Sequence, residues 1–260
     1  MKIGLLAIAA ASLLLSNPAN TAEIKVLASG AIKEAYLELI PQFEKASEHK
    51  VATTWAGTVD IKKRMAAGEV FDLVIVASPE LDAFIQEGKV VRGSRADLVR
   101  SGVGVAVRAG APKPDIGSGE ALKKALLAAE SIGYSTGPSG VYLASLFERM
   151  GIADQVKPKL KQTPPGVLVG SIIASGEAEI GFQQVSELIH VRGIDFLGPL
   201  PADVQKITVF SAGIHSGAKE AEAANALVKF LTAPAAASVF KRNGRSPADR
   251  SALRLLPCGP

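Results

Sequence analysis

The chain contains few cysteine, histidine and aromatic residues. Of 260 residues, one is cysteine, three are histidine and 5% are aromatic. The single cysteine, Cys258, cannot form an internal disulfide. His49, His190 and His215 are scattered without metal-ligand spacing, so the sequence predicts no metal site, and it predicts no cofactor. The scarcity of aromatic rings argues against stacking platforms for sugars or single-stranded nucleic acid.

The chain also lacks a strong charge of either sign. It has 29 Lys and Arg against 25 Asp and Glu, a formal net charge of +4. No block of basic residues forms a stripe, and the short run at Lys62–Arg64 is best explained as a solvated helix face, so no nucleic-acid partner is predicted. The slight positive balance weakly favours an anionic ligand, because net charge influences encounter with a ligand and not the fold.

The first 22 residues differ in composition from the rest of the chain. Lys2 is followed by an apolar run over residues 3–15 and by a small, polar segment over residues 16–22. This layout is typical of a secretory signal peptide, and we predict cleavage after Ala22. The apolar run is 13 residues long, short for a membrane span. No cysteine lies near the cleavage site, so a lipid anchor is not predicted.

The remaining chain is rich in apolar residues and alternates between strand and helix patterns. Hydrophobic residues make up 48% of the sequence, enough for a sizeable core. Strands are predicted at 24–28, 51–55, 71–77, 102–108, 131–135, 177–182, 194–198 and 205–214. Helices are predicted at 32–43, 59–67, 80–86, 120–129, 141–150, 167–174, 186–190, 219–231 and 234–242. Residues 97–100 are predicted as a connector, 157–166 as a proline-containing loop, and the tail beyond Arg245 as loosely held. The alternation predicts an α/β fold with mainly parallel sheets.

Small polar residues recur where predicted strands turn into helices. The turns are Ser29-Gly30, Gly57-Thr58 and Ser139-Gly140. The first N–H groups of a helix have no intrahelical partner, and the helix dipole makes them suitable donors to a small anion. Such turns also occur as plain connectors, and Ser29 could simply cap its helix. Their recurrence predicts N–H and hydroxyl groups that converge on one ligand.

Two further positions remain open from the residues alone. Gln183 and Gln184 follow a predicted strand, at the end where α/β sheets usually face a ligand crevice. Which of the two glutamines points inward is not decided by the pattern. Arg108, late in a glycine-rich strand, could add a cation to the site or be a solvated strand end.

Several longer stretches resemble one known family. IKVLASGAIKEAYLELIPQFEK, WAGTVDIKKRMAAGEVFDLVIVAS, GPSGVYLASLFERMGI and GEAEIGFQQ are similar to the periplasmic molybdate-binding proteins of ABC importers, in the same order along the mature chain. The resemblance implies a two-lobed periplasmic solute-binding fold, each lobe a mainly parallel sheet flanked by helices. The strand–helix alternation restarts near Gly102 and near Gln205, and we assign residues 23–103 and 211–260 to lobe 1 and residues 104–210 to lobe 2. It implies a periplasmic monomer that binds molybdate, tungstate or a related anion, and an ABC permease in the inner membrane as partner.

The resemblance also implies site residues. The family's first ligating serine falls on Ala31, with Ser29 two residues earlier, and its second falls on Thr58. A backbone donor falls on Ser139, and the ligating tyrosine falls on Gln184. The predicted ligand-binding set is Ser29, Gly30, Ala31, Gly57, Thr58, Ser139, Gly140 and Gln184. Molybdate would bind there as an oxyanion. Because Ala31 and Gln184 depart from the family pattern, a small organic acid is the alternative ligand.

A hydrolase-type enzyme is the remaining alternative. Ser139 lies in GPSGV, which lacks the Gly-x-Ser-x-Gly spacing of a nucleophile turn, and no histidine is near it in sequence. Glu177 and Glu179 are not expected to form an acid–base pair. The sequence therefore predicts a binding protein and not an enzyme.

Overall fold

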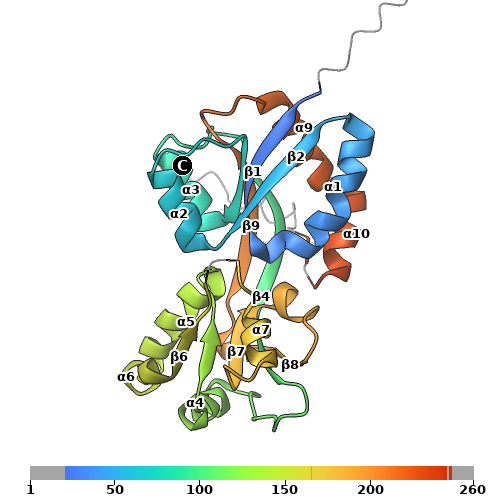
Figure 1. Ribbon diagram of the computed structural model, residues 1–260. Coiled ribbons are helices and arrows are strands. Elements are labelled where there is room, and N and C mark those ends of the chain that lie inside the picture. The colour runs from blue at the N-terminus through green and yellow to red at the C-terminus, as the bar shows by residue number, and fades with distance from the viewer. Residues whose placement is uncertain (1–20, 165, 245, 248–260) are drawn as a thin grey trace, which may run out of the picture.

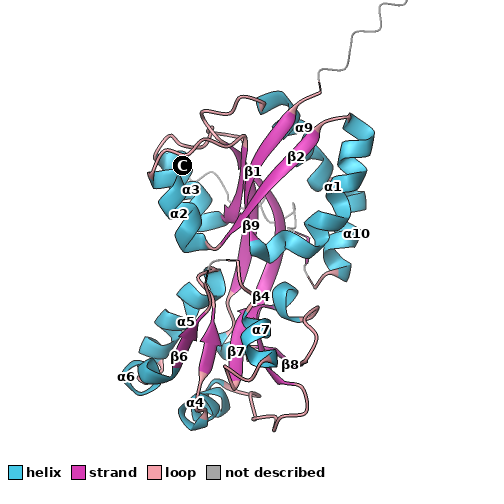
Figure 2. Ribbon diagram, viewed as in Figure 1, coloured by secondary structure: helices cyan, strands magenta, loops and turns pink. Residues whose placement is uncertain are grey.

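The computed structural model describes residues 21–164, 166–244 and 246–247. Two lobes lie one above the other, and the long strands β4 (Ala96–Arg108) and β9 (Ile207–Ile214) run between them (Figure 1). Helices flank the strands of each lobe (Figure 2). The predicted two-lobed α/β fold is confirmed.

The upper lobe is built on three parallel strands. β1 (Glu23–Ser29) lies between β2 (Lys50–Ala56) and β3 (Leu73–Ala77). β9 then pairs antiparallel with β3, and β4 pairs antiparallel with β9. β3 is buried along its whole length, as expected for a strand that is covered on both faces.

Two layers of helices cover this sheet. α1 (Lys33–Ser47), α9 (Ala221–Leu231) and α10 (Pro234–Arg242) pack on one face, and α2 (Thr58–Ala66) and α3 (Ser78–Gln86) pack on the other. Side chains alternate between the faces of a strand, so neighbouring residues of β1 and β3 enter different cores. The carboxyl ends of β1 and β2 lead toward the lower lobe (Figure 1).

The lower lobe repeats this arrangement. β5 (Ile132–Tyr134) pairs in parallel with β6 (Leu160–Gln162) and with β7 (Ile180–Gln184), and β8 (Ile194–Pro199) pairs with β4. Its helices are α4 (Gly119–Ala128), α5 (Pro138–Arg149), α6 (Ala153–Val156), α7 (Val169–Ala174) and α8 (Val185–Leu188). Short 3₁₀ segments lie at Gly30–Ile32 (η1), Lys157–Lys159 (η2) and Ala202–Val204 (η3), and β10 (Ser246–Pro247) pairs with β4.

β4 belongs to both lobes. Residues 96–102 pair with β9, while residues 103–108 pair with β7 and β8. The predicted connector at 97–100 is therefore wrong, because this segment is paired with β9 as part of β4. The assignment of 23–103 and 211–260 to one lobe and 104–210 to the other stays a prediction.

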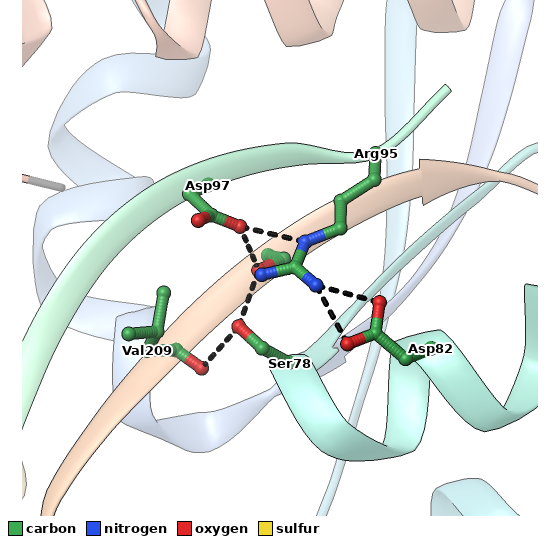
Figure 3. Close-up of polar contacts among 6 residues, drawn as sticks. Ser78, Asp82, Arg95, Asp97 and Val209 are labelled. Carbon is green, nitrogen blue, oxygen red and sulfur yellow. Dashed lines mark hydrogen bonds and ion pairs between the residues drawn. The ribbon is translucent and has the colours of Figure 1, made fainter. Parts of the chain in front are cut away.

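Hydrogen bonds hold the start of β4 against β9 and α3 (Figure 3). The hydroxyls of Ser78 and Ser211 are 2.7 Å apart, and Ser211 Oγ donates to Asp97 Oδ1 at 2.6 Å. Arg95 donates to Asp97 at 2.9 Å and to both carboxylate oxygens of Asp82 at 2.6 Å. Burial acts to raise the pKa of Asp97, but hydrogen bonds from Arg95 and Ser211, with nearby positive charge, hold that pKa below its usual value. Asp97 is thus a paired strand residue and not a loop residue.

Other boundaries also differ from the sequence prediction. The segment predicted as a loop over 157–166 contains η2 and the edge strand β6, which is short enough to fit between prolines. α5 begins at Pro138 and not at Val141, because proline suits the first turn of a helix. In the tail predicted to be loosely held, Ser246–Pro247 pair with β4, and residues 248–260 lie outside the described residues.

The predicted signal peptide lies outside the described residues, except for Thr21 and Ala22. Ala22 is part of the fold: its N–H donates to His49 Nδ1 at 3.2 Å, and its carbonyl accepts from the Lys50 N–H at 2.8 Å. Cleavage directly after Ala22 would remove both hydrogen bonds.

In the described part of the chain, no single helix is long and apolar enough to cross a membrane. α9 and α10 meet that test together, by length and composition alone, as a pair bent by 64°.

Candidate functional site

A cavity of about 260 Å³ lies between the lobes. Both lobes contribute to its wall, and they do so mainly through the turns that join strands to helices. The upper lobe contributes Ser29, Gly30, Lys33, Glu34, Trp55, Ala56 and Gly57. The lower lobe contributes Ser135, Thr136, Gly137, Pro138, Thr163, Pro164, Gly166, Val167, Leu168, Gln183, Ser186, Glu187, His190 and Val191.

Helix N-termini from both lobes meet at this cavity. Gly57 precedes α2 and Gly137 precedes α5, and both glycines line the wall. Ser29 also lines it and caps η1, where its Oγ accepts from the Ala31 N–H at 3.3 Å. The N-terminal ends of α2 and α5 therefore come together at the cavity from different lobes, where the two helix dipoles favour negative charge.

Thr58, Ser139 and Gly140 lie directly behind this wall. Thr58 is 2% exposed, and its Oγ1 has no hydrogen-bond partner among the described residues. Ser139 is fully buried, with its Oγ 3.5 Å from the Oγ of Ser135, which lines the cavity. Gly140 packs under the Ser135 carbonyl. The predicted turns thus come together at the cavity, but Thr58 and Ser139 lie behind the residues that line it. Ligand contact by these residues stays a prediction.

The two glutamines of β7 face different surroundings, because successive side chains alternate across a strand. Gln183 lines the cavity. Gln184 is fully buried and does not line the cavity. It lies against the strands that run between the lobes. Its amide is best satisfied with Nε2 donating to the Gly102 carbonyl at 3.0 Å. The structure therefore places Gln183 at the cavity and Gln184 against β4.

Ala31 and Arg108 also lie outside the lining. Ala31 is buried, and its carbonyl accepts a hydrogen bond from Ser186 Oγ of the opposite lobe at 2.9 Å. Arg108 is exposed at the end of β4. A second bond between the lobes runs from the Val59 N–H to the Thr136 carbonyl at 3.4 Å, so the cleft is closed.

Ionisable side chains on the wall were missed by sequence reasoning. Lys33, Glu34, Glu187 and His190 all line the cavity. Lys33 Nζ lies 5.9 Å from the centre of the Trp55 ring, within range of a cation–π contact. No spacing pattern could have found this group, because α1 and α8 are brought together only by closure of the lobes. Ser135 and Thr136 could have been found, since they lie at the end of the strand predicted at 131–135, shortly before the Ser139-Gly140 turn.

The cavity has the chemistry of an anion site with acid–base groups. No cluster of three or more His, Cys, Asp or Glu side chains that could hold a metal ion occurs among the described residues. Thr163 is 2% exposed and lines the cavity, and its Oγ1 finds no partner within the described part of the chain. A bound oxygen ligand would give this hydroxyl the hydrogen bond that it lacks.

Comparison with known proteins agrees with this architecture. The family model described as bacterial extracellular solute-binding protein matches residues 24–246. An aconitate isomerase of Pseudomonas sp is 38% identical over 253 residues, which cover 95% of each chain. The molybdate-binding protein ModA of Azotobacter vinelandii is 29% identical over 89% of this chain and 92% of its own. The solved structure of the Azotobacter vinelandii periplasmic molybdate-binding protein has a TM-score of 0.72 at 19% identity, covering 87% of this chain and 100% of that one. The resemblance read from the sequence is confirmed at the level of the family. The chain belongs to the bacterial extracellular solute-binding proteins.

Proposed function

We propose that this protein binds a small polycarboxylic acid of the aconitate class between its lobes and isomerises it. The observation that carries this proposal is the composition of the cavity wall. Helix N-termini of both lobes lie beside the ionisable side chains of Lys33, Glu34, Glu187 and His190. N–H groups at helix ends suit carboxylates, and acid–base side chains suit proton transfer.

The size and charge of the cavity favour a polycarboxylate over a tetrahedral oxyanion. Its volume of about 260 Å³ approaches that of small-molecule sites, roughly 300 Å³ and above. A tetrahedral oxyanion has one central atom and four oxygens and would fill little of this space. Glu34 and Glu187 would repel a compact dianion held between them, because like charges disfavour each other at short range. A longer acid can place its carboxylates at the helix N-termini and near Lys33.

Isomerisation of such an acid needs only proton transfer. A proton leaves the methylene carbon, the double bond moves by one carbon, and a proton adds to the former vinylic carbon. Atoms and electrons balance without an oxidant or reductant. Negative charge that develops on the carboxylate oxygens in the transition state would be stabilised by donors already in place at the helix ends. The relative named aconitate isomerase, 38% identical along 95% of both chains, supports this activity.

The test combines turnover with binding. The purified protein, unfolded and refolded to remove any bound ligand, is mixed with trans-aconitate, and conversion to cis-aconitate is followed by proton NMR. Melting is measured with each aconitate, citrate, molybdate and tungstate. We expect conversion, and a stabilisation of about 2.7 kcal/mol at a ligand concentration 100 times the dissociation constant. Tight binding of molybdate without binding of aconitate would contradict the proposal.

A receptor for an ABC importer is the second candidate function. The relative named molybdate-binding protein and the hydroxyl groups around the helix ends favour it. In that case the ligand would be molybdate, tungstate or an organic anion. The protein would be a periplasmic monomer that delivers this ligand to an inner-membrane permease. Binding of aconitate without conversion would favour a receptor for organic acids, and the original expectation of a protein without enzymatic activity would then stand.

Replacing Thr163 with valine tests whether the cavity holds an oxygen ligand. Valine keeps the shape of threonine and removes a buried hydroxyl that has no partner among the described residues, so we expect unchanged or slightly higher stability without ligand. A hydrogen bond to a charged group contributes about 1.5–3 kcal/mol, so affinity for trans-aconitate should fall roughly 10- to 150-fold. Calorimetric titration and urea unfolding measure the two effects.

The matched control for this variant is Thr54→Val. Thr54 is a half-buried threonine that lies on β2 and does not line the cavity. Its replacement should leave affinity unchanged. Equal affinities of the Thr163→Val variant and the wild type would show that this hydroxyl does not reach the ligand.

A further inference from the structure

The Glu187 side chain is held at the cavity by a hydrogen bond from a buried amide. The Gln183 amide donates from Nε2 to Glu187 Oε1 at 3.0 Å. Gln183 is 2% exposed, and its Oε1 accepts from the Val169 N–H at 2.8 Å, so the orientation of the amide is fixed by the backbone of α7. The nitrogen of Gln183 must therefore face Glu187. A buried amide of defined orientation thus positions this carboxylate.

Glu187 also lies where the two lobes meet. A Cβ atom built on Gly30 would be 3.2 Å from Glu187 Oε1, so the carboxylate of the lower lobe packs against the turn that opens η1 in the upper lobe. Ser186, its neighbour, bonds across the cleft to the Ala31 carbonyl. The carboxylate is thus brought to the cavity wall in the closed protein.

The other candidates for a proton-transfer group are more open to solvent. Glu34 and His190 are exposed, whereas Glu187 is half-buried. Lys33 lies over the Trp55 ring and is positively charged, which suits it to hold a substrate carboxylate and not to remove a proton. A base works best at a fixed position within hydrogen-bond reach of the proton that it removes.

We infer that Glu187 is the catalytic base of the isomerisation, and that Gln183 positions it; this inference rests on the function proposed above. The Glu187 carboxylate takes a proton from the substrate methylene carbon. The electron pair of that C–H bond forms a new double bond to the central carbon, and the former double-bond pair moves onto the outer vinylic carbon and its carboxylate. Glu187 then returns a proton to that carbon. The carboxylate is regenerated, and no cofactor or redox partner is consumed.

The test is Glu187→Gln in the full-length protein. Glutamine keeps the size of the side chain and an oxygen that can still accept from Gln183, so the protein should fold and bind trans-aconitate with an affinity within a few-fold of wild type. A general base contributes about 10²- to 10⁴-fold, and we expect kcat to fall by that factor with little change in KM. In D₂O, exchange of the substrate methylene protons should be lost together with turnover. Glu187→Asp should retain measurable activity, because it keeps the carboxylate.

Two further variants separate this role from a general effect of charge. Glu148→Gln removes an exposed carboxylate of α5 outside the cavity and should leave kcat unchanged. Glu34→Gln removes the other carboxylate of the wall. A loss of turnover in Glu34→Gln with full activity in Glu187→Gln would overturn the assignment of the base.

Failure of the inference is distinguishable from failure of the proposed function. If the wild type converts aconitate and Glu187→Gln converts it at the same rate, Glu187 is not the base, although the protein is an isomerase. If the wild type binds aconitate without converting it or exchanging its methylene protons, both the isomerase function and the role of Glu187 are overturned.

Discussion

Replacing Gly57 with alanine is expected to weaken ligand binding without weakening the ligand-free protein. Gly57 precedes α2 in the upper lobe with φ −77° and ψ 165°, a conformation that alanine adopts readily. An added Cβ would lie 2.3 Å from Thr136 Oγ1 and 3.1 Å from the Thr136 carbonyl carbon, both in the lower lobe. The methyl group therefore opposes closure of the cleft and disturbs neither lobe by itself. Overpacking of this kind costs about 1–3 kcal/mol, so affinity should fall roughly 5- to 150-fold.

Calorimetric titration with trans-aconitate measures the loss of affinity, and urea unfolding without ligand measures stability. Thr136→Ala in the Gly57→Ala background provides the matched test, because it removes the nearest of the contacting atoms and should restore part of the affinity. A variant that is less stable without ligand yet binds normally would show that Gly57 supports the upper lobe and not the closure of the cleft.

Gly140→Ala is expected to destabilise the protein itself. Alanine normally stabilises a helix relative to glycine by about 1 kcal/mol. In α5, however, the added Cβ would lie 1.8 Å from the Ser135 carbonyl oxygen and 2.9 Å from its carbonyl carbon. Backbone atoms cannot rotate away as a side chain can, so α5 must move off β5. We expect a loss of about 3 kcal/mol or more, measured by urea unfolding.

The control for Gly140→Ala is its neighbour, Ser139→Ala. Ser139 Oγ makes a long contact of 3.5 Å with Ser135 Oγ, so its removal should cost at most about 1 kcal/mol. If Gly140→Ala gained stability as helix propensity alone predicts, the close approach of α5 to Ser135 would be contradicted.

The order of strands and helices could be predicted because apolar periodicity records local burial. β3, α9 and α10 fall close to their predicted positions for this reason. The pattern failed at 97–100, where Asp97 reads as a loop residue but is paired through contacts with Arg95 and Ser211. Ser211 is more than a hundred residues away from Asp97 in sequence, so this contact is set by tertiary structure.

The site could be predicted only in outline. Recurring small polar turns pointed to Ser29, Gly30 and Gly57, because helix N-termini carry a local signature, and these residues line the cavity; their contact with a ligand stays a prediction. The choice between Gln183 and Gln184 depended on where β7 ends, and a shift of one residue exchanges the two faces. Glu187 carried no signal at all, since its place at the cavity follows from closure of the lobes.

The sharing of β4 between the lobes also has a consequence for melting. Its first half is bonded to β9 and its second half to β7 and β8, so neither half of the molecule possesses a complete sheet without this strand. Unfolding of one lobe would remove hydrogen bonds from β4, and this would weaken the sheet of the other lobe. Thermal unfolding should therefore occur in a single cooperative step, although the shape of the protein suggests two separate bodies.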